Sequence, residues 1–134
     1  MIKAKLDLKV MMEEIDRVRA FVFSIADDAG LGKLQTHQLH LIVEEAVANV
    51  VNYSGATMMS LSAWLEGDSI FVSVTDDGVP FDPTQYPSPN LNVPVEERKI
   101  GGLGIHYIHK MSDEVTYRRE DGKNILTMRK VRKK

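Results

Sequence analysis

The sequence of 134 residues contains no cysteine, which excludes disulfide bonds, thiolate catalysis and cysteine-ligated zinc or iron–sulfur sites. No apolar run approaches the roughly 20 residues that span a bilayer, so we expect no membrane segment and a cytoplasmic location. The net charge is only −2, which gives no overall attraction to nucleic acid, and we expect no direct nucleic-acid partner. These absences, with a composition that is ordinary for a globular protein, are typical of a single small domain.

Proline is missing from most of the chain, because all five prolines lie within residues 80–94. A long aperiodic segment inside a small domain is more typical of a lid or binding loop than of a plain connection. We therefore predict a lid loop at about 79–101. The last six residues, 129–134, include five basic ones, which predicts a solvated basic tail, with a contact for an acidic partner as the alternative.

The remaining residues follow patterns that predict a single α+β domain over residues 1–134. Strand-like runs occur near residues 4–10, 58–65, 69–75, 114–120 and 124–130. Apolar residues three or four apart predict helices near 11–29, 36–53 and 103–111. The order is β-α-α-β-β-lid-α-β-β. Its simplest packing is a two-layer α/β sandwich, with the helices on one face of a mixed, mostly antiparallel sheet.

The first motif is Glu45-x-x-x-Asn49 in the second predicted helix. Residues four apart lie on the same helical face, and these two flank the apolar stripe, where they can face a cleft. An amide oxygen such as that of Asn49 is a suitable ligand for Mg²⁺, and Glu45 can accept a proton from an attacking hydroxyl or water. A plain surface pair remains the simpler alternative for this motif alone.

The second motif is Asp76-x-Gly78, which ends a predicted strand. An aspartate at the edge of a cleft can accept a hydrogen bond from an amino group such as that of adenine. A glycine, which has no Cβ, lets the backbone pass close to a flat ring. An ordinary turn is the alternative, since Asp-Gly is a common turn pair.

The third motif is Gly102-Leu103-Gly104, at the start of the third predicted helix. Free backbone N–H groups at a helix start favour a phosphate, and Lys99 stands just before them as a cation. A flexible hinge is the alternative. The order of the three motifs, however, provides a group for each part of a Mg-ATP molecule.

Together these residues resemble the motifs of the GHKL superfamily, the Bergerat-type ATP-binding fold of gyrase, histidine kinases and MutL. Glu45 to Asn49 resembles its N box, Asp76-x-Gly78 its first glycine box, and Gly102-x-Gly104 its second. The closest likeness is to single-domain bacterial anti-sigma-factor kinases of the RsbW/SpoIIAB type. In that superfamily a threonine on the last strand helps the aspartate to hold adenine, so the resemblance implies this role for Thr127.

The resemblance implies an ATP- and Mg²⁺-dependent serine/threonine protein kinase with Glu45 as the catalytic base. Its substrate would be a small antagonist protein in a partner-switching system, and a sigma factor or similar regulator would be a second partner. Related proteins are often homodimers, although the sequence identifies no dimer surface. Two alternatives stay open: a nucleotide-dependent binding switch with little or no kinase activity, and an ATPase in which Glu45 activates water.

Overall fold

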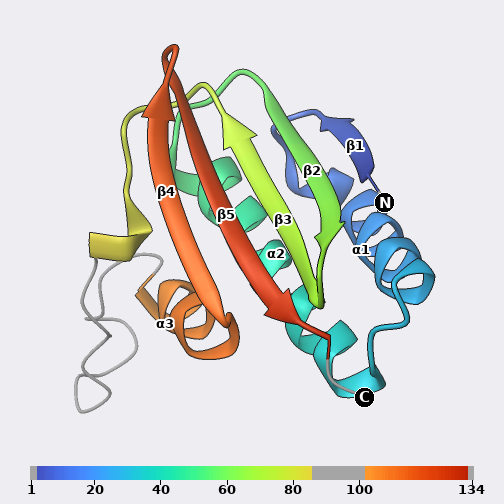
Figure 1. The fold of residues 1–134 in the computed structure, drawn as a ribbon. Coiled ribbons are helices and arrows are strands. Elements are labelled where there is room, and N and C mark those ends of the chain that lie inside the picture. The colour runs from blue at the N-terminus through green and yellow to red at the C-terminus, as the bar shows by residue number, and fades with distance from the viewer. Residues whose placement is uncertain (1–2, 86–101, 133–134) are drawn as a thin grey trace.

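A computed structural model describes residues 3–85 and 102–132 of the protein, with side chains described from 107 onward in the second range (Figure 1). The strands are β1 (Lys3–Leu8), β2 (Met59–Glu66), β3 (Ser69–Asp76), β4 (Glu114–Glu120) and β5 (Lys123–Val131). The helices are α1 (Ile15–Asp28), α2 (Lys33–Tyr53) and α3 (Gly102–Met111), with single 3₁₀ turns η1 (Met12–Glu14) and η2 (Pro83–Gln85). The predicted order of elements is confirmed.

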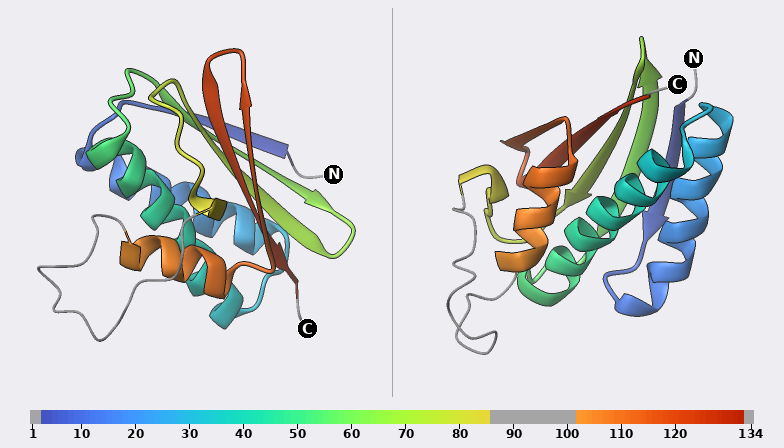
Figure 2. Two further views of the ribbon diagram at one scale, coloured as in Figure 1. Left: turned by 90° about the vertical axis from the view of Figure 1, so that its left-hand side faces the viewer. Right: turned by 90° about the horizontal axis from the view of Figure 1, so that it is seen from below.

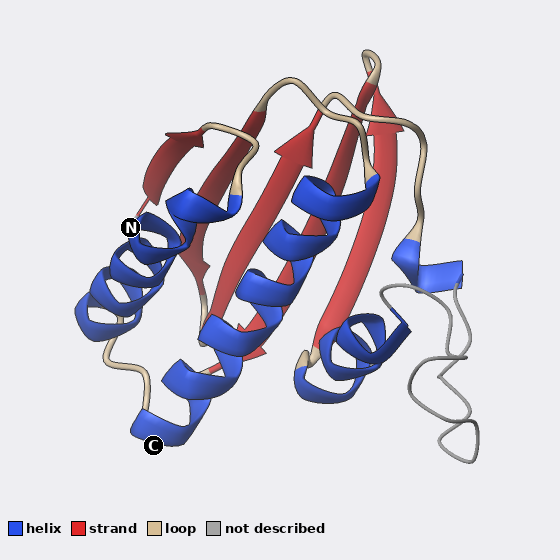
Figure 3. Ribbon diagram, turned by 180° about the vertical axis from the view of Figure 1, so that it is seen from behind, coloured by secondary structure: helices blue, strands red, loops and turns tan. Residues whose placement is uncertain are grey.

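The five strands form one sheet in the order β1-β2-β3-β5-β4. All three α-helices cover the same face of it, as Figures 2 and 3 show, which confirms the predicted two-layer sandwich. The sheet was expected to be mixed, but each of its pairings is antiparallel. The reason is that β4 and β5 form a hairpin, and β5 rather than β4 returns beside β3.

The core lies between the helices and one face of the sheet. On α2 the predicted apolar stripe is buried throughout. Beneath it, every second residue of β5 is buried, and so are the residues of β3 that pair with them. Burying one such aliphatic side chain contributes about 1.5–3 kcal/mol before the entropy cost of ordering the chain. The fully buried residues of α2 and β3 are Leu39, Ile42, Val43, Val47, Ile70 and Val72. Within residues 3–85 and 102–132, no helix is both long and apolar enough to cross a bilayer.

The basic end of the chain begins inside β5, which continues to Val131, so its first residues form a strand and not a tail. Lys130 is 7% exposed, and its Nζ donates to the carbonyl of Met111, the last residue of α3, at 2.6 Å. Arg132 donates from Nη1 to the carbonyl of Ala29, which caps α1, at 2.9 Å. Cations at helix C-termini stabilise the unpaired carbonyls found there. The expectation of a tail from residue 129 is therefore wrong for its first residues, and 133–134 lie outside the described residues.

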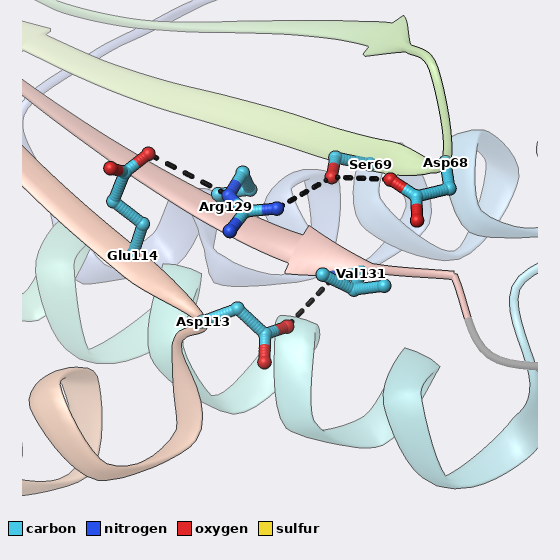
Figure 4. A network of polar contacts seen from close by, with 6 residues as sticks. All are labelled: Asp68, Ser69, Asp113, Glu114, Arg129 and Val131. Carbon is cyan, nitrogen blue, oxygen red and sulfur yellow. Dashed lines mark hydrogen bonds and ion pairs between the residues drawn. The ribbon is translucent and has the colours of Figure 1, made fainter.

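Arg129 is held on the other face of β5, as Figure 4 shows. Its Nε lies 3.6 Å from Oε1 of Glu114, and its Nη1 donates to Oγ of Ser69 at 2.9 Å. Ser69 in turn donates to Asp68 at 3.2 Å. These contacts join β4, β5 and the hairpin between β2 and β3 into one polar network, which we call the Arg129 network.

Candidate functional site

A cleft opens between α2 and the ends of β3 and β5. The empty space between its walls, part of it open to solvent, is about 540 Å³. Its walls are mostly apolar and carry a few polar side chains, which is the usual composition of a small-molecule site. The lining residues are Ala46, Asn49, Val50, Tyr53, Ser54, Val74, Asp76, Val79, Phe81, Pro83, Tyr117, Asn124 and Leu126.

Asp76 is the buried carboxylate of this cleft and is only 4% exposed. Its Oδ1 accepts hydrogen bonds from the Gly78 N–H at 2.8 Å and from Asn124 Nδ2 at 3.1 Å. Its Oδ2 receives no hydrogen bond from the residues that the structure describes. The side chain is thus fixed through one oxygen, while the other can accept a hydrogen bond from a ligand.

Position 78 requires a glycine because it lies against Ser54. A Cβ added here would lie 2.4 Å from the carbonyl oxygen of Ser54 and 2.6 Å from its Cβ. The next residue, Val79, donates its N–H to that same carbonyl at 2.9 Å. The sequence had suggested that this glycine makes room for a flat ring. In the structure it makes room for the end of α2, which locks the chain after β3 against the helix.

The two residues of the first motif lie differently with respect to the cleft. Asn49 lines it, and its side chain receives no hydrogen bond from the described residues. Glu45 is half-buried one helical turn earlier, about 6 Å along the axis, and is not a lining residue. Burial raises the pKa of Glu45, and the negative charge of neighbouring Glu44 raises it further. A carboxylate with a raised pKa is a better proton acceptor near neutral pH.

The phosphate-binding part of the predicted site is described only in outline. Gly102, Leu103 and Gly104 are the first residues of α3, as predicted, and α3 packs against α2. Lys99 and most of the predicted lid, 86–101, lie outside the described residues. Pro83, shortly before residues 86–101, is described. Its carbonyl oxygen lies 2.8 Å from Nε2 of His109 in α3, a hydrogen-bond distance.

Thr127 does not lie near Asp76, in contrast to the role that the resemblance implied for it. In the β3–β5 register Asp76 stands opposite Asn124, whereas Thr127 stands opposite Ser73 and shares a 2.6 Å hydrogen bond with its hydroxyl. Successive strand residues point to opposite faces, so a residue three positions from Asn124 faces away from the helices and the cleft. The implied role for Thr127 is therefore corrected by the geometry.

Asn124 is the functional candidate that the sequence reasoning missed. It is 5% exposed, lines the cleft and donates to Asp76. A signal for it was present, since Asn124 shares the alternation of Leu126 and Met128 and so lies in phase with the buried face of β5. A polar residue at a buried position of a strand usually has a specific partner.

Comparisons with known proteins agree with this geometry. The model of the family described as histidine kinase-like ATPase domain matches residues 9–130. The serine-protein kinase RsbW of Halalkalibacterium halodurans is 32% identical over 124 residues, which cover 88% of this chain and 76% of that protein. The serine/threonine-protein kinase BtrW of Bordetella bronchiseptica is 28% identical over 94 residues, covering 67% of this chain and 66% of the relative.

Among solved structures, the RsbU and RsbW domains of Rv1364c from Mycobacterium tuberculosis superpose with a TM-score of 0.69 at 18% identity. That match covers 96% of this chain, and this chain spans only 32% of the other. The Acinetobacter baumannii histidine kinase AdeS gives a TM-score of 0.53 at 13% identity, covering 100% of this chain and 70% of that one. At these identities the likeness concerns the fold.

Proposed function

The chain belongs to the histidine kinase-like ATPase domain family, and we propose that it is an ATP-binding serine/threonine protein kinase of the anti-sigma-factor type. Its substrate is a small antagonist protein, and a sigma factor or similar regulator is its second partner. The observation that carries the proposal is that Asp76 and Asn49 line one cleft. The relatives that align with most of this chain are serine-protein kinases, which supports the choice of activity.

The residues present fit Mg-ATP. The available oxygen of Asp76 suits the exocyclic amino group of adenine, and the Asn49 amide, which has no described protein partner, would hold a Mg²⁺ ion that accompanies the nucleotide. The backbone at Gly102, Leu103 and Gly104 would hold phosphate at the start of α3, with Lys99 as a cation. Bound Mg²⁺ would neutralise negative charge on the phosphates. Thr127 takes no part in this proposal.

The reaction is transfer of the γ-phosphoryl group to a serine or threonine of the antagonist. The substrate hydroxyl oxygen forms a bond to the γ-phosphorus, the bond to the ADP oxygen breaks, and the hydroxyl proton passes to the Glu45 carboxylate. Glu45 stands one turn of α2 before Asn49 and outside the cleft lining, which suits a group that acts on an incoming hydroxyl rather than on the nucleotide.

The direct test combines binding with transfer. Calorimetry with ATP and ADP, with and without Mg²⁺, is run on wild type, Asn49→Ala and Asp76→Asn; we expect Mg²⁺-dependent ATP binding that Asn49→Ala loses. Phosphoryl transfer from γ-labelled ATP to serine and threonine of proteins in a lysate of the source organism should then fall by about 10²–10⁴-fold in Glu45→Gln. No nucleotide binding to wild type at millimolar concentration would overturn the proposal.

The pH profile of transfer identifies the base. Glu45 must be ionised to accept the proton, and its raised pKa means that activity falls on the acid side at a higher pH than for an ordinary glutamate. Glu44→Gln is the matched variant, because removing the neighbouring charge lowers the pKa of Glu45 and moves this fall to lower pH. Glu44 also lies 3.1 Å from His40 Nε2, so the profile of His40→Gln serves as the control for losing that contact.

Other outcomes select the alternatives within the same fold. Nucleotide binding with no labelled protein in any assay would indicate a binding switch. Phosphate release that needs no partner and is lost in Glu45→Gln would indicate an ATPase.

A further inference from the structure

The side chain of Asn124 uses its whole hydrogen-bonding capacity inside the wall of the cleft. Nδ2 donates to Asp76 Oδ1 at 3.1 Å and to the carbonyl of Val79 at 2.8 Å. Oδ1 accepts from the hydroxyl of Tyr117 at 2.5 Å and from the N–H of Phe81 at 3.3 Å. A primary amide offers two donors and two acceptor lone pairs, so no capacity is left over.

The orientation of this amide is set by its neighbours. The Phe81 N–H can only donate, so it must face the amide oxygen. The Val79 carbonyl and the Asp76 carboxylate can only accept, so they must face the amide nitrogen. A flipped amide would place its oxygen against both acceptors. The chain therefore dictates one orientation, and the Tyr117 hydroxyl supports it from β4.

Two parts of the site meet at this one side chain. Asp76 is the carboxylate that the proposed function assigns to the base of the nucleotide, and Val79 and Phe81 begin the segment that follows β3. A second tie from β4 acts on the same segment, since Arg119 Nη1 donates to the carbonyl of Gly78 at 2.8 Å. The segment after β3 is thus bound to β4 and β5 at three successive points before it leaves the cleft.

We propose that Asn124 is a positioning residue for nucleotide recognition, which aims the Asp76 carboxylate at the base and fixes the Val79–Phe81 wall beside it. Tyr117 acts through Asn124 by holding the amide oxygen. The inference rests on the proposed function, since it assigns the base to Asp76. Its consequence is selectivity: a fixed acceptor favours an exocyclic amino group, whereas a ring carbonyl in that position brings two acceptors together.

The first experiment compares ATP with inosine triphosphate, which carries a carbonyl in place of the adenine amino group. Dissociation constants are measured at one Mg²⁺ concentration for wild type, Asn124→Ala, Tyr117→Phe and Thr116→Ala. We expect wild type to bind ATP more tightly than inosine triphosphate. In Asn124→Ala the ratio of the two dissociation constants should fall about tenfold, mostly because ATP binds more weakly. Tyr117→Phe should lose a few-fold, and the exposed neighbour Thr116→Ala should match wild type.

The ratio of the two dissociation constants distinguishes a positioning role from a general loss of folding. A variant that is merely less folded binds both nucleotides less well and keeps their ratio, whereas a misaimed carboxylate changes the ratio itself. Thermal unfolding monitored by circular dichroism records the folded fraction of each variant. If Asn124→Ala does not fold, Tyr117→Phe, which removes a single hydroxyl, still tests the ratio.

A second experiment uses Asn124→Asp, which preserves shape but replaces the donor with a second carboxylate. Two carboxylates about 3 Å apart repel when both are ionised, and sharing one proton restores a donor toward Asp76. ATP affinity relative to wild type at the same pH should therefore be lowest near pH 8 and recover toward pH 5. The other ionisable groups of this wall are Tyr117 and Arg119 on β4, together with Asp77, which bonds away from it to Thr57 and Met58.

The outcomes distinguish a failure of the proposed function from a failure of the role proposed for Asn124. Wild type that binds no nucleotide would overturn both the proposed function and this inference. Wild type that prefers ATP, with an unchanged ratio in folded Asn124→Ala and Tyr117→Phe and no acid recovery in Asn124→Asp, would overturn the inference alone.

Discussion

The two ends of the β3–β5 pair carry polar networks of opposite character. The strands run side by side over eight residue pairs, from Asp76 opposite Asn124 at the cleft end to Ser69 opposite Val131 at the far end. At the cleft end the polar side chains point toward the helices and are about 5% exposed. At the far end Arg129 and Glu114 point to the uncovered face, and their side chains are 31% and 56% exposed.

The two networks differ in which hydrogen-bonding atoms they leave without a partner among the described residues. The Arg129 network closes on protein groups: Arg129 contacts Glu114 and Ser69, and Asp113 accepts the Val131 N–H at 2.7 Å (Figure 4). At the cleft end Asp76 keeps one oxygen without a described partner beside an apolar cavity. A buried acceptor fixed in place but unpaired is costly to the fold and useful to a ligand. The far end therefore closes on itself, and the cleft end carries the acceptor that we propose contacts the nucleotide.

The largest expected effect comes from changing one carboxylate at each end. Asp76→Asn should weaken ATP binding by about 100-fold, because an amide can turn a donor toward the adenine amino group and loses the charge-assisted bond. Glu114→Gln removes a half-exposed ion pair worth about 0–1 kcal/mol and should leave ATP binding unchanged. Isothermal titration calorimetry measures both constants, and equal losses in the two variants would contradict the contrast between the ends.

A smaller effect, on stability, comes from the glycines at the two ends. Gly78→Ala places a methyl group 2.4 Å from the Ser54 carbonyl oxygen and should lower the free energy of unfolding by about 1–3 kcal/mol. Gly67→Ala in the β2–β3 hairpin meets nothing within 4 Å, and its cost comes only from its φ of +60°, about 1 kcal/mol. Chemical denaturation measures both values. A Gly78→Ala variant as stable as wild type would contradict the close packing of this glycine on the end of α2.

The sequence predicted the fold well because its signals are local. The apolar stripe of Leu39, Ile42, Val43 and Val47 predicted α2, and strand alternation together with hairpin turns predicted all five strands within about two residues of their observed ends. The sheet order follows from long-range pairing, and no local pattern determines whether β4 or β5 returns beside β3.

The candidate site was predicted in part. Asp76 and Asn49 were identified by spacing, and both line the cleft. The role of Thr127 was implied by the resemblance alone, and strand phase excludes it, because an odd-numbered residue of β5 cannot share a face with Asn124 or Leu126. Asn124 gains its importance from Asp76, Val79 and Tyr117, which are distant in sequence, and only the β3–β5 register brings them together.

The smallest expected effect is on the pH dependence of stability, and it concerns Asp77, the neighbour of Asp76 that faces the start of β2. Asp77 accepts hydrogen bonds from the Thr57 hydroxyl and from the N–H groups of Met58 and Thr57, and these lower its pKa from the ordinary 3.8 to about 2. A lowered pKa in the folded state means that the stabilisation is full above about pH 4 and is lost as pH falls toward 2.

Asp77→Ala should therefore reduce stability most at neutral pH, and its difference from wild type should shrink below pH 4. Asp68→Ala is the matched change at the far end, where the side chain accepts a single hydrogen bond at 3.2 Å from Ser69. Thermal unfolding between pH 7 and pH 3 measures both differences, with ATP binding at pH 7 recorded in parallel. Unchanged binding in Asp77→Ala would confine the ligand contact at this end to Asp76, whereas a loss as large as that of Asp76→Asn would extend the site to the β2 side.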